Sequence, residues 1–200
     1  MSQKDSARVQ FEGEFFAHRL LWYGARHMRD VARDQTDGSY FCRVSALLFM
    51  SFSVEGFVND LLMRTRPATW NRAREFFRQG EYRGTSGKLR YLLDEFDVSY
   101  VRGARPFQTV VALLKRRHLF VHPTTEKQSG ELRIQTGQQA PPPSNKLARI
   151  AEPAFLARAH HDVELLCDKL QSAAYEKEGH PVVTSALAFN GPMGWLARWS

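Results

Sequence analysis

The sequence predicts an all-α protein, a compact bundle of about five to six helices with a C-terminal extension. Apolar residues recur at spacings of three and four through most of the chain, which is typical of helices that bury one face. No stretch alternates apolar and polar residues for long enough to build a sheet. Turn and helix-start signals separate the periodic segments, at Asp37-Gly38, Gly80, Pro106 and Pro153.

The first two helices are expected over residues 10–34 and about 40–64. The first has one apolar face, whereas the second is apolar around most of its circumference, which is typical of a central helix. Asp37-Gly38 marks the turn between them, and Ser39 is the expected N-cap of the second helix. A single polar stripe interrupts this second helix at spacings of four, formed by Ser51, Glu55 and Asn59.

Three shorter helices are predicted in the middle of the chain. Gly80 closes the first, and Thr85 or Ser86 caps the second. Pro106 opens the third at a favoured first-turn position, and this helix runs to about residue 121. The apolar positions of the three helices are Trp70, Ala73, Phe76, Phe77, Leu89, Leu92, Leu93, Phe96, Val110, Leu113, Leu114 and Val121.

The remainder of the chain contains a polar segment and one long helix. Residues 123–148 include three consecutive prolines and are expected to form a loop, with a small hairpin around residues 131–135. Pro153 begins the last helix. Its inner face is formed by Leu156, Val163, Leu166, Cys167 and Leu170.

We divide the chain into a helical core over residues 1–125, a linker over 126–150, and a C-terminal helix and tail over 151–200 that packs on the core. Residues 186–200 show little periodicity. The apolar residues expected to pack back on the domain are Phe189, Trp195 and Trp199; a tail that binds a partner is the alternative.

The composition indicates a globular protein with a substantial core. A chain of 200 residues, 43% of them hydrophobic, buries about 70% of its unfolded surface and needs neither disulfides nor a metal to fold. Cys42 and Cys167 are therefore expected to be reduced core thiols. The N-terminus lacks a signal-peptide pattern, and the apolar run over residues 44–58 is too short to span a bilayer. We expect a cytoplasmic protein without a membrane partner.

The net charge of +7 is concentrated in the middle of the chain. Residues 64–125 contain 13 Lys or Arg against 5 Asp or Glu, whereas the flanking segments are almost balanced. A localised basic surface indicates a polyanionic partner, most simply a nucleic acid; a solvated basic face is the alternative. Interleaved aromatic residues could stack on bases or belong to the core. The candidate nucleic-acid contacts are Arg72, Arg74, Arg78, Arg83, Lys88 and Arg90.

The strongest candidate site lies at the end of the fifth predicted helix, in residues 114–123. Arg117 falls on the apolar stripe of this helix, where a guanidinium costs several kcal/mol unless it is paired or used. Pro123 disfavours the helical conformation at His122, so the helix is expected to end there. The His122 ring can then turn back towards Arg117.

An arginine beside a histidine in a basic region suits cleavage of RNA without a metal or cofactor. Arginine binds phosphate through a rigid, bidentate fork. Histidine titrates near neutral pH and can move a proton to or from a ribose hydroxyl. Such acid–base catalysis contributes about 10²–10⁴-fold, and each donor to the charged phosphorane contributes about 10²–10³-fold. The expected reaction is attack of the 2′-hydroxyl on the adjacent phosphate.

The segment Arg117-His118-Leu119-Phe120-Val121-His122 resembles the R-polar-x-x-x-H signature of HEPN domains. These are compact helical ribonucleases and nucleotide-binding proteins of prokaryotic toxins and defence systems. Residues 49–62 resemble the central helix of the family with its acidic residue. Residues 88–93 resemble the helix that lies between this central helix and the helix that carries the motif. The resemblance covers about residues 10–125. It implies a homodimer in which arginine and histidine from both protomers form one composite cleft.

The resemblance also implies roles for individual residues. Arg117 would bind the scissile phosphate, and His122 would act as general acid or base. The family most often has asparagine after the arginine, whereas this chain has His118, which becomes a second candidate for proton transfer. A toxin of this family would have an antitoxin or regulatory protein as partner. Some carry a tyrosine two residues after the histidine as a modification site; this chain has Thr124, which puts that regulation in doubt.

Glu55 on the central helix is a candidate supporting residue. A buried carboxylate is expensive alone and tolerable opposite an arginine. Glu55 would either orient Arg117 or Arg116 at the cleft or form a purely structural ion pair. Asn59 would be a supporting partner in both cases.

The sequence alone leaves two other functions open. A catalytically silent HEPN-like module would bind nucleic acid, nucleotide or a protein, keep Arg117 paired with Glu55, and use His122 only as a helix cap. A metal hydrolase that uses His118 and His122, spaced i and i+4, would bind zinc; a third ligand is not evident in the sequence, so no metal site is predicted. His160 and His161 are expected to be surface histidines.

Overall fold

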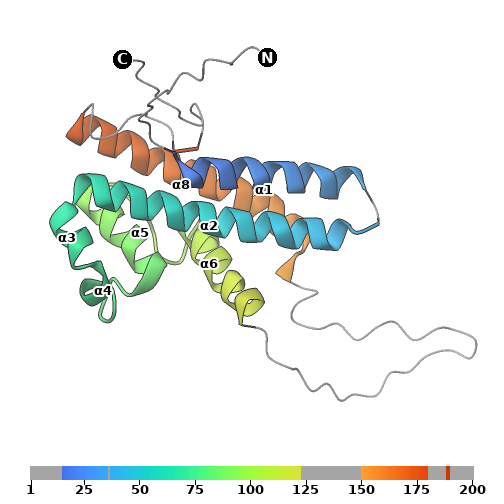
Figure 1. The fold of residues 1–200 in the computed structure, drawn as a ribbon, viewed down its shortest axis with the longest axis horizontal. Helices are drawn as coiled ribbons and strands as arrows, with labels where there is room; N and C mark the ends of the chain where they lie inside the picture. The colour runs from blue at the N-terminus through green and yellow to red at the C-terminus, as the bar shows by residue number, and fades with distance from the viewer. Residues whose placement is uncertain (1–14, 36, 123–149, 180–187, 190–200) are drawn as a thin grey trace, which may run out of the picture.

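The computed structural model describes residues 15–35, 37–122, 150–179 and 188–189. These residues form seven α-helices and no strand, which confirms the all-α fold class. Three long helices, α1 (Ala17–Asp34), α2 (Ser39–Thr65) and α8 (Pro153–Glu178), run along the molecule (Figure 1). The shorter helices are α3 (Pro67–Asn71), α4 (Ala73–Phe76), α5 (Gly84–Glu95) and α6 (Phe107–Val121).

The central helix is α2, as its apolar circumference predicts. It contacts α1, α3, α5, α6 and α8. Buried hydroxyl groups on α2 find acceptors within the bundle: Ser51 Oγ donates to the Leu47 carbonyl at 2.7 Å, and Ser53 Oγ donates to the His18 carbonyl at 2.6 Å. Ser51 is fully buried, so it does not share the partly exposed surface of Glu55 and Asn59.

One hydrophobic core joins α1, α2, α5, α6 and α8. Trp22 of α1 is fully buried, and its ring stacks on Phe189 with 4.4 Å between ring centroids. The predicted packing of Phe189 on the domain is therefore confirmed, as is the predicted inner face of α8. Both cysteines are free, and Cys167 is a core thiol as predicted, whereas Cys42 is only partly buried. Trp195, Trp199, the predicted loop and its hairpin lie outside the described residues.

Several helix starts differ from the prediction. Ser39 is the first residue of α2 rather than its N-cap, because Gly38 takes the N-cap position with φ of +72°. The Ser39 hydroxyl instead accepts a hydrogen bond from Arg43 at 3.0 Å. Neither Thr85 nor Ser86 caps α5, which begins at Gly84. Pro106 is the residue before α6 rather than part of its first turn.

The predicted third helix consists of two short helices. Arg72 ends α3 and precedes α4, with φ of −106° and ψ of 13°, outside the helical region. Phe77 is buried and Trp70 is partly buried, whereas Phe76 is 43% exposed. The aromatic residues of this segment thus divide between the core and the surface.

A close backbone contact places α5 against the turn that precedes it. A Cβ atom at Gly87 would overlap the carbonyl group of Tyr82, so only glycine fits there. Gly87 lies between Thr85 and Lys88, two residues of α5 that contact α2. The glycine therefore helps to set the position of α5 at the site described below.

By length and composition, α2 is the one helix within the described ranges that could cross a membrane. About 44% of its most apolar window is buried inside the protein. The core helix of a soluble protein meets the same criteria. The apolar helix extends beyond residues 44–58 and is long enough to cross a bilayer, contrary to the expectation from that run alone. The cytoplasmic location therefore stays a prediction.

Candidate functional site

Helices α2, α5 and α6 bring three of the polar side chains together. Arg117 of α6 donates from Nη1 to Oε2 of Glu55 on α2. The other carboxylate oxygen, Oε1, accepts a hydrogen bond from Thr85 Oγ1 of α5 at 3.1 Å. The Glu55 carboxylate therefore links all three helices, and Arg117, rather than Arg116, is its arginine partner.

A second polar pair lies one turn further along α2 and α5. Lys88 Nζ donates to Asn59 Oδ1 at 2.8 Å. Burial lowers the pKa of Lys88, and the negative charge of Glu55 opposes this effect. The ammonium group also lies 5.6 Å from the ring centroids of Trp70 and Phe77. Lys88 is thus held between α2 and the aromatic residues near α5.

The Arg117 side chain remains partly accessible to solvent. It is 23% exposed, and that of Glu55 is 34% exposed. Its guanidinium carbon lies 5.7 Å from the centroid of the Phe52 ring. Arginine has five N–H donors, and the described contact with Glu55 uses one of them. Other N–H groups of Arg117 could therefore bind an anion from solvent.

The two histidines of the motif contact each other. Both side chains are exposed, with 4.6 Å between ring centroids. The helix ends at His122 as predicted, with φ of −125° and ψ of 66°. The ring of His122 lies against His118 in this structure. The turn back towards Arg117 that the helix end would allow is not the orientation described. The reason is local: the His122 N–H still bonds to the His118 carbonyl at 2.9 Å, which keeps His122 over the preceding turn.

Arg116 has a different position from the rest of the motif. It donates to the Ile150 carbonyl at 2.6 Å, and its guanidinium carbon lies 3.4 Å from the Phe155 ring centroid. Burial lowers its pKa. Arg116 therefore holds the segment before α8 against α6, which is a structural role rather than the supporting role at the cleft that the sequence suggested.

The end of α6 is more exposed than its apolar pattern predicts. Val110, Leu113 and Leu114 are buried, whereas Leu119 is 42% and Val121 is 49% exposed. The last turns of α6 project from the bundle in Figure 1. The prediction that Val121 faces the core is wrong, because α6 extends past the helices that cover its first half.

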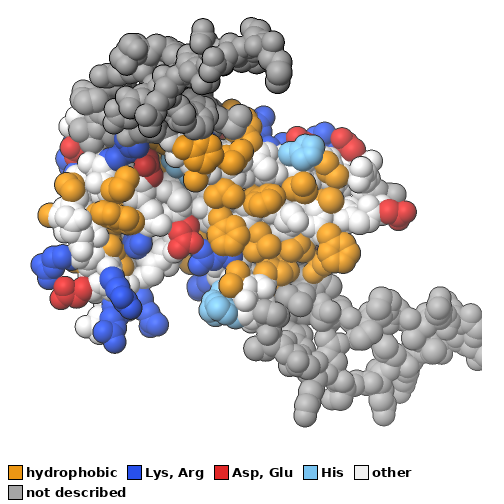
Figure 2. Space-filling view, in the orientation of Figure 1, with side chains coloured by type: hydrophobic (Ala, Val, Ile, Leu, Met, Phe, Trp, Pro, Cys, Tyr) orange, Lys and Arg blue, Asp and Glu red, His pale blue; other side chains and the backbone are white. Residues whose placement is uncertain are grey.

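An apolar surface lies beside the Arg117–Glu55 pair. Figure 2 shows apolar side chains gathered over α1 and α2 on this face. Three apolar residues of α2 lie on one helix face, because they are spaced by seven and four residues: Phe41, Leu48 and Phe52. Phe41 and Phe52 are exposed and Leu48 is partly buried. This face continues towards Glu55, three residues after Phe52. Leu20 and Tyr23 of α1 are also exposed. We call these five residues the α1–α2 apolar surface.

The basic residues of the middle segment divide into two groups. Arg72, Arg74, Arg78 and Arg83 are exposed, and Figure 2 shows basic side chains over α4. By contrast, the Arg90 side chain is 14% exposed and donates to the Glu81 carboxylate and carbonyl and to Tyr100. Lys88 is also held, by Asn59. Of the six residues predicted to contact nucleic acid, the four exposed arginines therefore remain accessible.

Two residues of the site were missed by the sequence analysis. Thr85 was interpreted as a helix cap, and its contact with Glu55 depends on how α5 packs on α2. Phe52 was counted among the apolar residues of α2. Its position three residues before Glu55 places both on one helix face, which is a signal that the sequence contained.

His160 is not the surface residue that the sequence predicted. Its side chain is 12% exposed, and its ring stacks on Trp22 with 4.7 Å between ring centroids. Burial, with a contribution from the charge of Arg29, lowers the pKa of His160 to about 4. His161, the next residue, is exposed.

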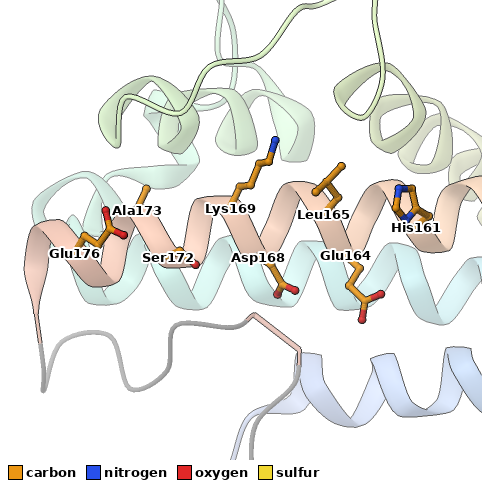
Figure 3. A pocket seen from close by; sticks show the side chains of 8 residues that line it. All are labelled: His161, Glu164, Leu165, Asp168, Lys169, Ser172, Ala173 and Glu176. Carbon is orange, nitrogen blue, oxygen red and sulfur yellow. The ribbon is translucent and has the colours of Figure 1, made fainter.

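The outer side of α8 contains an open cavity of about 530 Å³. Its eight lining residues all come from α8, and their side chains diverge: His161, Leu165 and Lys169 point towards α5 and α6, whereas Glu164 and Asp168 point towards α1 (Figure 3). No group of three or more His, Cys, Asp or Glu side chains in the described ranges could hold a metal ion.

Comparison with protein-family models, with curated proteins and with solved structures gives no match to this chain. The HEPN resemblance therefore stays a prediction that rests on the quoted motif residues. The site itself is defined by the contacts among α2, α5 and α6.

Proposed function

We propose that the protein is a metal-independent endoribonuclease of the HEPN type, active as a toxin or antiphage effector in the cytoplasm. The observation that supports this most is the arrangement of Arg117, a partly exposed guanidinium held by Glu55, on the same helix end as two exposed histidines. These are the groups that metal-free cleavage of RNA requires.

In the proposed reaction, Arg117 binds the scissile phosphate through its outer N–H donors. One histidine takes the proton of the 2′-hydroxyl, whose oxygen attacks the phosphorus. The bond to the 5′-oxygen breaks, and a protonated histidine gives that oxygen a proton. His122 is the principal acid or base, and His118 is the second proton-transfer group. The products are a 2′,3′-cyclic phosphate and a 5′-hydroxyl.

Glu55 and Thr85 have positioning roles in this proposal. The carboxylate holds the Arg117 guanidinium in place, so a phosphate would bind to a side chain that has already lost part of its freedom. The exposed arginines near α4 bind the backbone of the same RNA at a distance from the cleavage point. The substrate is single-stranded RNA, whose backbone such a surface can follow.

We also propose that the active form is a homodimer with a composite site. The α1–α2 apolar surface supports this, because contiguous exposed apolar residues mark interaction surfaces. A two-fold interface uses the same patch on both protomers. Contact through α2 would bring the two copies of the Arg117–Glu55 pair, which adjoins Phe52, close to one axis. An antitoxin or other regulatory protein is the further partner of a toxin of this type.

A specific observation favours a second function, a silent module that binds nucleic acid, nucleotide or a protein. The His122 ring contacts His118 and not Arg117 in the protomer, and the Arg117–Glu55 pair would also be expected of a structural ion pair. In this case Arg117 contributes to binding and His122 only ends α6.

Growth on expression in a bacterial host tests the proposal. We expect the wild-type protein to arrest growth, and Arg117→Ala or His122→Ala to restore it. His27→Ala is the matched control, since it removes an exposed histidine of α1 and should leave the arrest unchanged. Soluble expression and circular dichroism show that each variant folds. Arrest that persists in folded Arg117→Ala and His122→Ala variants would contradict the proposal.

A further inference from the structure

A second basic site lies at the start of α8, formed by other residues than the Arg117–Glu55 pair. A cavity of about 400 Å³ opens between α1, α2 and α8. This volume is within the range of small-molecule pockets, about 300–1,000 Å³. Its lining combines an apolar floor with three arginines: Ala32, Pro153, Leu156 and Ala157 with Arg29, Arg33 and Arg43.

The lining has an excess of positive charge. Asp30 is the one carboxylate among the eight lining residues, against three guanidinium groups. Arg29 donates to Asp30 at 2.9 Å and 3.1 Å, and Arg33 lies 3.8 Å from the same carboxylate while it donates to Asp34. The eight lining residues carry a net charge of +2, and Asp34, which pairs with Arg33 from outside the lining, reduces the local excess to +1. The cavity therefore keeps a positive charge that attracts an anion.

Arg43 is a fixed cation in this wall. Its Nε donates to the Ala151 carbonyl at 2.7 Å, and its Nη1 donates to Ser39 Oγ at 3.0 Å. Both acceptors are neutral, so the contacts hold the guanidinium in place without balancing its charge. A donor that is already ordered loses little entropy when a ligand binds. The remaining N–H groups have the geometry that suits a phosphate.

We propose that this cavity binds a small molecule that carries a phosphate dianion and an apolar body. The phosphate would contact Arg29, Arg33 and Arg43, and the apolar body would lie on Ala32, Leu156 and Ala157. The site shares no residue with the proposed nuclease site. It would act as a separate ligand site on the same protomer, and the proposal does not depend on ribonuclease activity.

Titration calorimetry with phenyl phosphate tests the proposal on the full-length protein. Inorganic phosphate and benzoate serve as probes of the anion and of the apolar body. We expect phenyl phosphate to bind more tightly than either, and the Arg29→Gln/Arg33→Gln variant to bind it at least about tenfold more weakly. Ala157→Trp should weaken binding by a similar factor, because it fills the cavity from an exposed position and leaves the charge unchanged.

Arg26→Gln is the matched control. Arg26 is an exposed arginine one turn earlier on α1 that does not line the cavity, and its loss should leave phenyl phosphate affinity unchanged. The absence of binding to the wild type at about 10 mM phenyl phosphate would overturn the proposal. Equal affinity in the double variant and the wild type, or an equal loss in Arg26→Gln, would also overturn it. Benzoate that binds as tightly as phenyl phosphate would overturn the choice of phosphate.

Discussion

Arg117 and Glu55 are the residues on which both the stability and the chemistry of the site depend. The two side chains are partly buried, and Glu55 also accepts a hydrogen bond from Thr85. Removing one partner of such a pair leaves a charge with poor solvation, so the loss exceeds the net contribution of the pair. The same contact holds the partly exposed guanidinium group in place.

We expect Glu55→Gln to lower the free energy of unfolding by about 1–2 kcal/mol, below the value for fully buried pairs because both groups keep some solvent contact. Urea denaturation of Glu55→Gln, Arg117→Gln and the double variant measures the coupling between them. Glu75→Gln is the control, since Glu75 and Arg72 form an exposed pair, and its stability should match the wild type. A coupling energy indistinguishable from zero would contradict the assigned ion pair.

At this scale, sequence reasoning identified partners better than orientations. A glutamate on a central helix needs a counter-charge, which predicted a pair with Arg117 or Arg116. The structure shows that Arg117 is the partner. The direction of the His122 ring could not be predicted from the sequence, because it depends on the rotamer and backbone at a helix end. Arg90 and Lys88 were predicted as nucleic-acid contacts, but tertiary acceptors on Glu81 and Asn59 hold them.

The elements around the site have separate tasks. Helix α2 supplies Glu55, α5 supplies Thr85, and α6 supplies Arg117 and the histidines. The segment from α3 to the start of α5 presents the exposed arginines. If these arginines bind the RNA backbone, binding should release counterions and depend on salt in proportion to the number of contacts.

We expect the Arg74→Gln/Arg78→Gln/Arg83→Gln variant to bind single-stranded RNA more weakly and with a smaller salt dependence. Each lost phosphate contact should reduce the slope of log K against log salt by about 0.7. Fluorescence anisotropy over a range of salt concentrations measures this slope. Arg26→Gln, which removes an exposed arginine from α1, should leave it unchanged. An unchanged slope in the triple variant would exclude this surface as the RNA contact.

The helices were predictable from periodicity, whereas several of their ends were not. The long apolar pattern of α2 and Pro153 at the start of α8 were sufficient for those two elements. Ser39 and Thr85 are good N-cap residues, yet their hydroxyls serve Arg43 and Glu55 instead. These partners come from a neighbouring turn and from another helix, so local sequence preference could not decide between the two uses.

For the whole molecule, the α1–α2 apolar surface predicts self-association. Phe41→Asp should convert a dimer into a monomer, because Phe41 is 72% exposed and a charge there costs little in the free protomer. Light scattering after size exclusion measures the mass. Val101→Asp is the control, since Val101 is 67% exposed and lies outside this surface. A wild-type protein that is monomeric at high micromolar concentration would contradict the homodimer.

The arrangement of the whole bundle was less accessible to sequence reasoning than its parts. Periodicity identified α1, α2 and α8, but it could not show that Phe41 and Phe52 stay exposed while Leu47 and Val54 are buried. All four are apolar residues on a helix predicted to be apolar around most of its circumference. Their different environments follow from which faces α1, α5, α6 and α8 cover.

Cleavage of labelled single-stranded RNA in EDTA is the most direct test of the proposed nuclease. The account predicts cleavage by the wild type with 2′,3′-cyclic phosphate ends, and a rate lower by about 10²–10⁴-fold for a folded His122→Ala protein. If the wild type binds the RNA and leaves it intact, or if His122→Ala cleaves at the wild-type rate, the proposed chemistry is wrong.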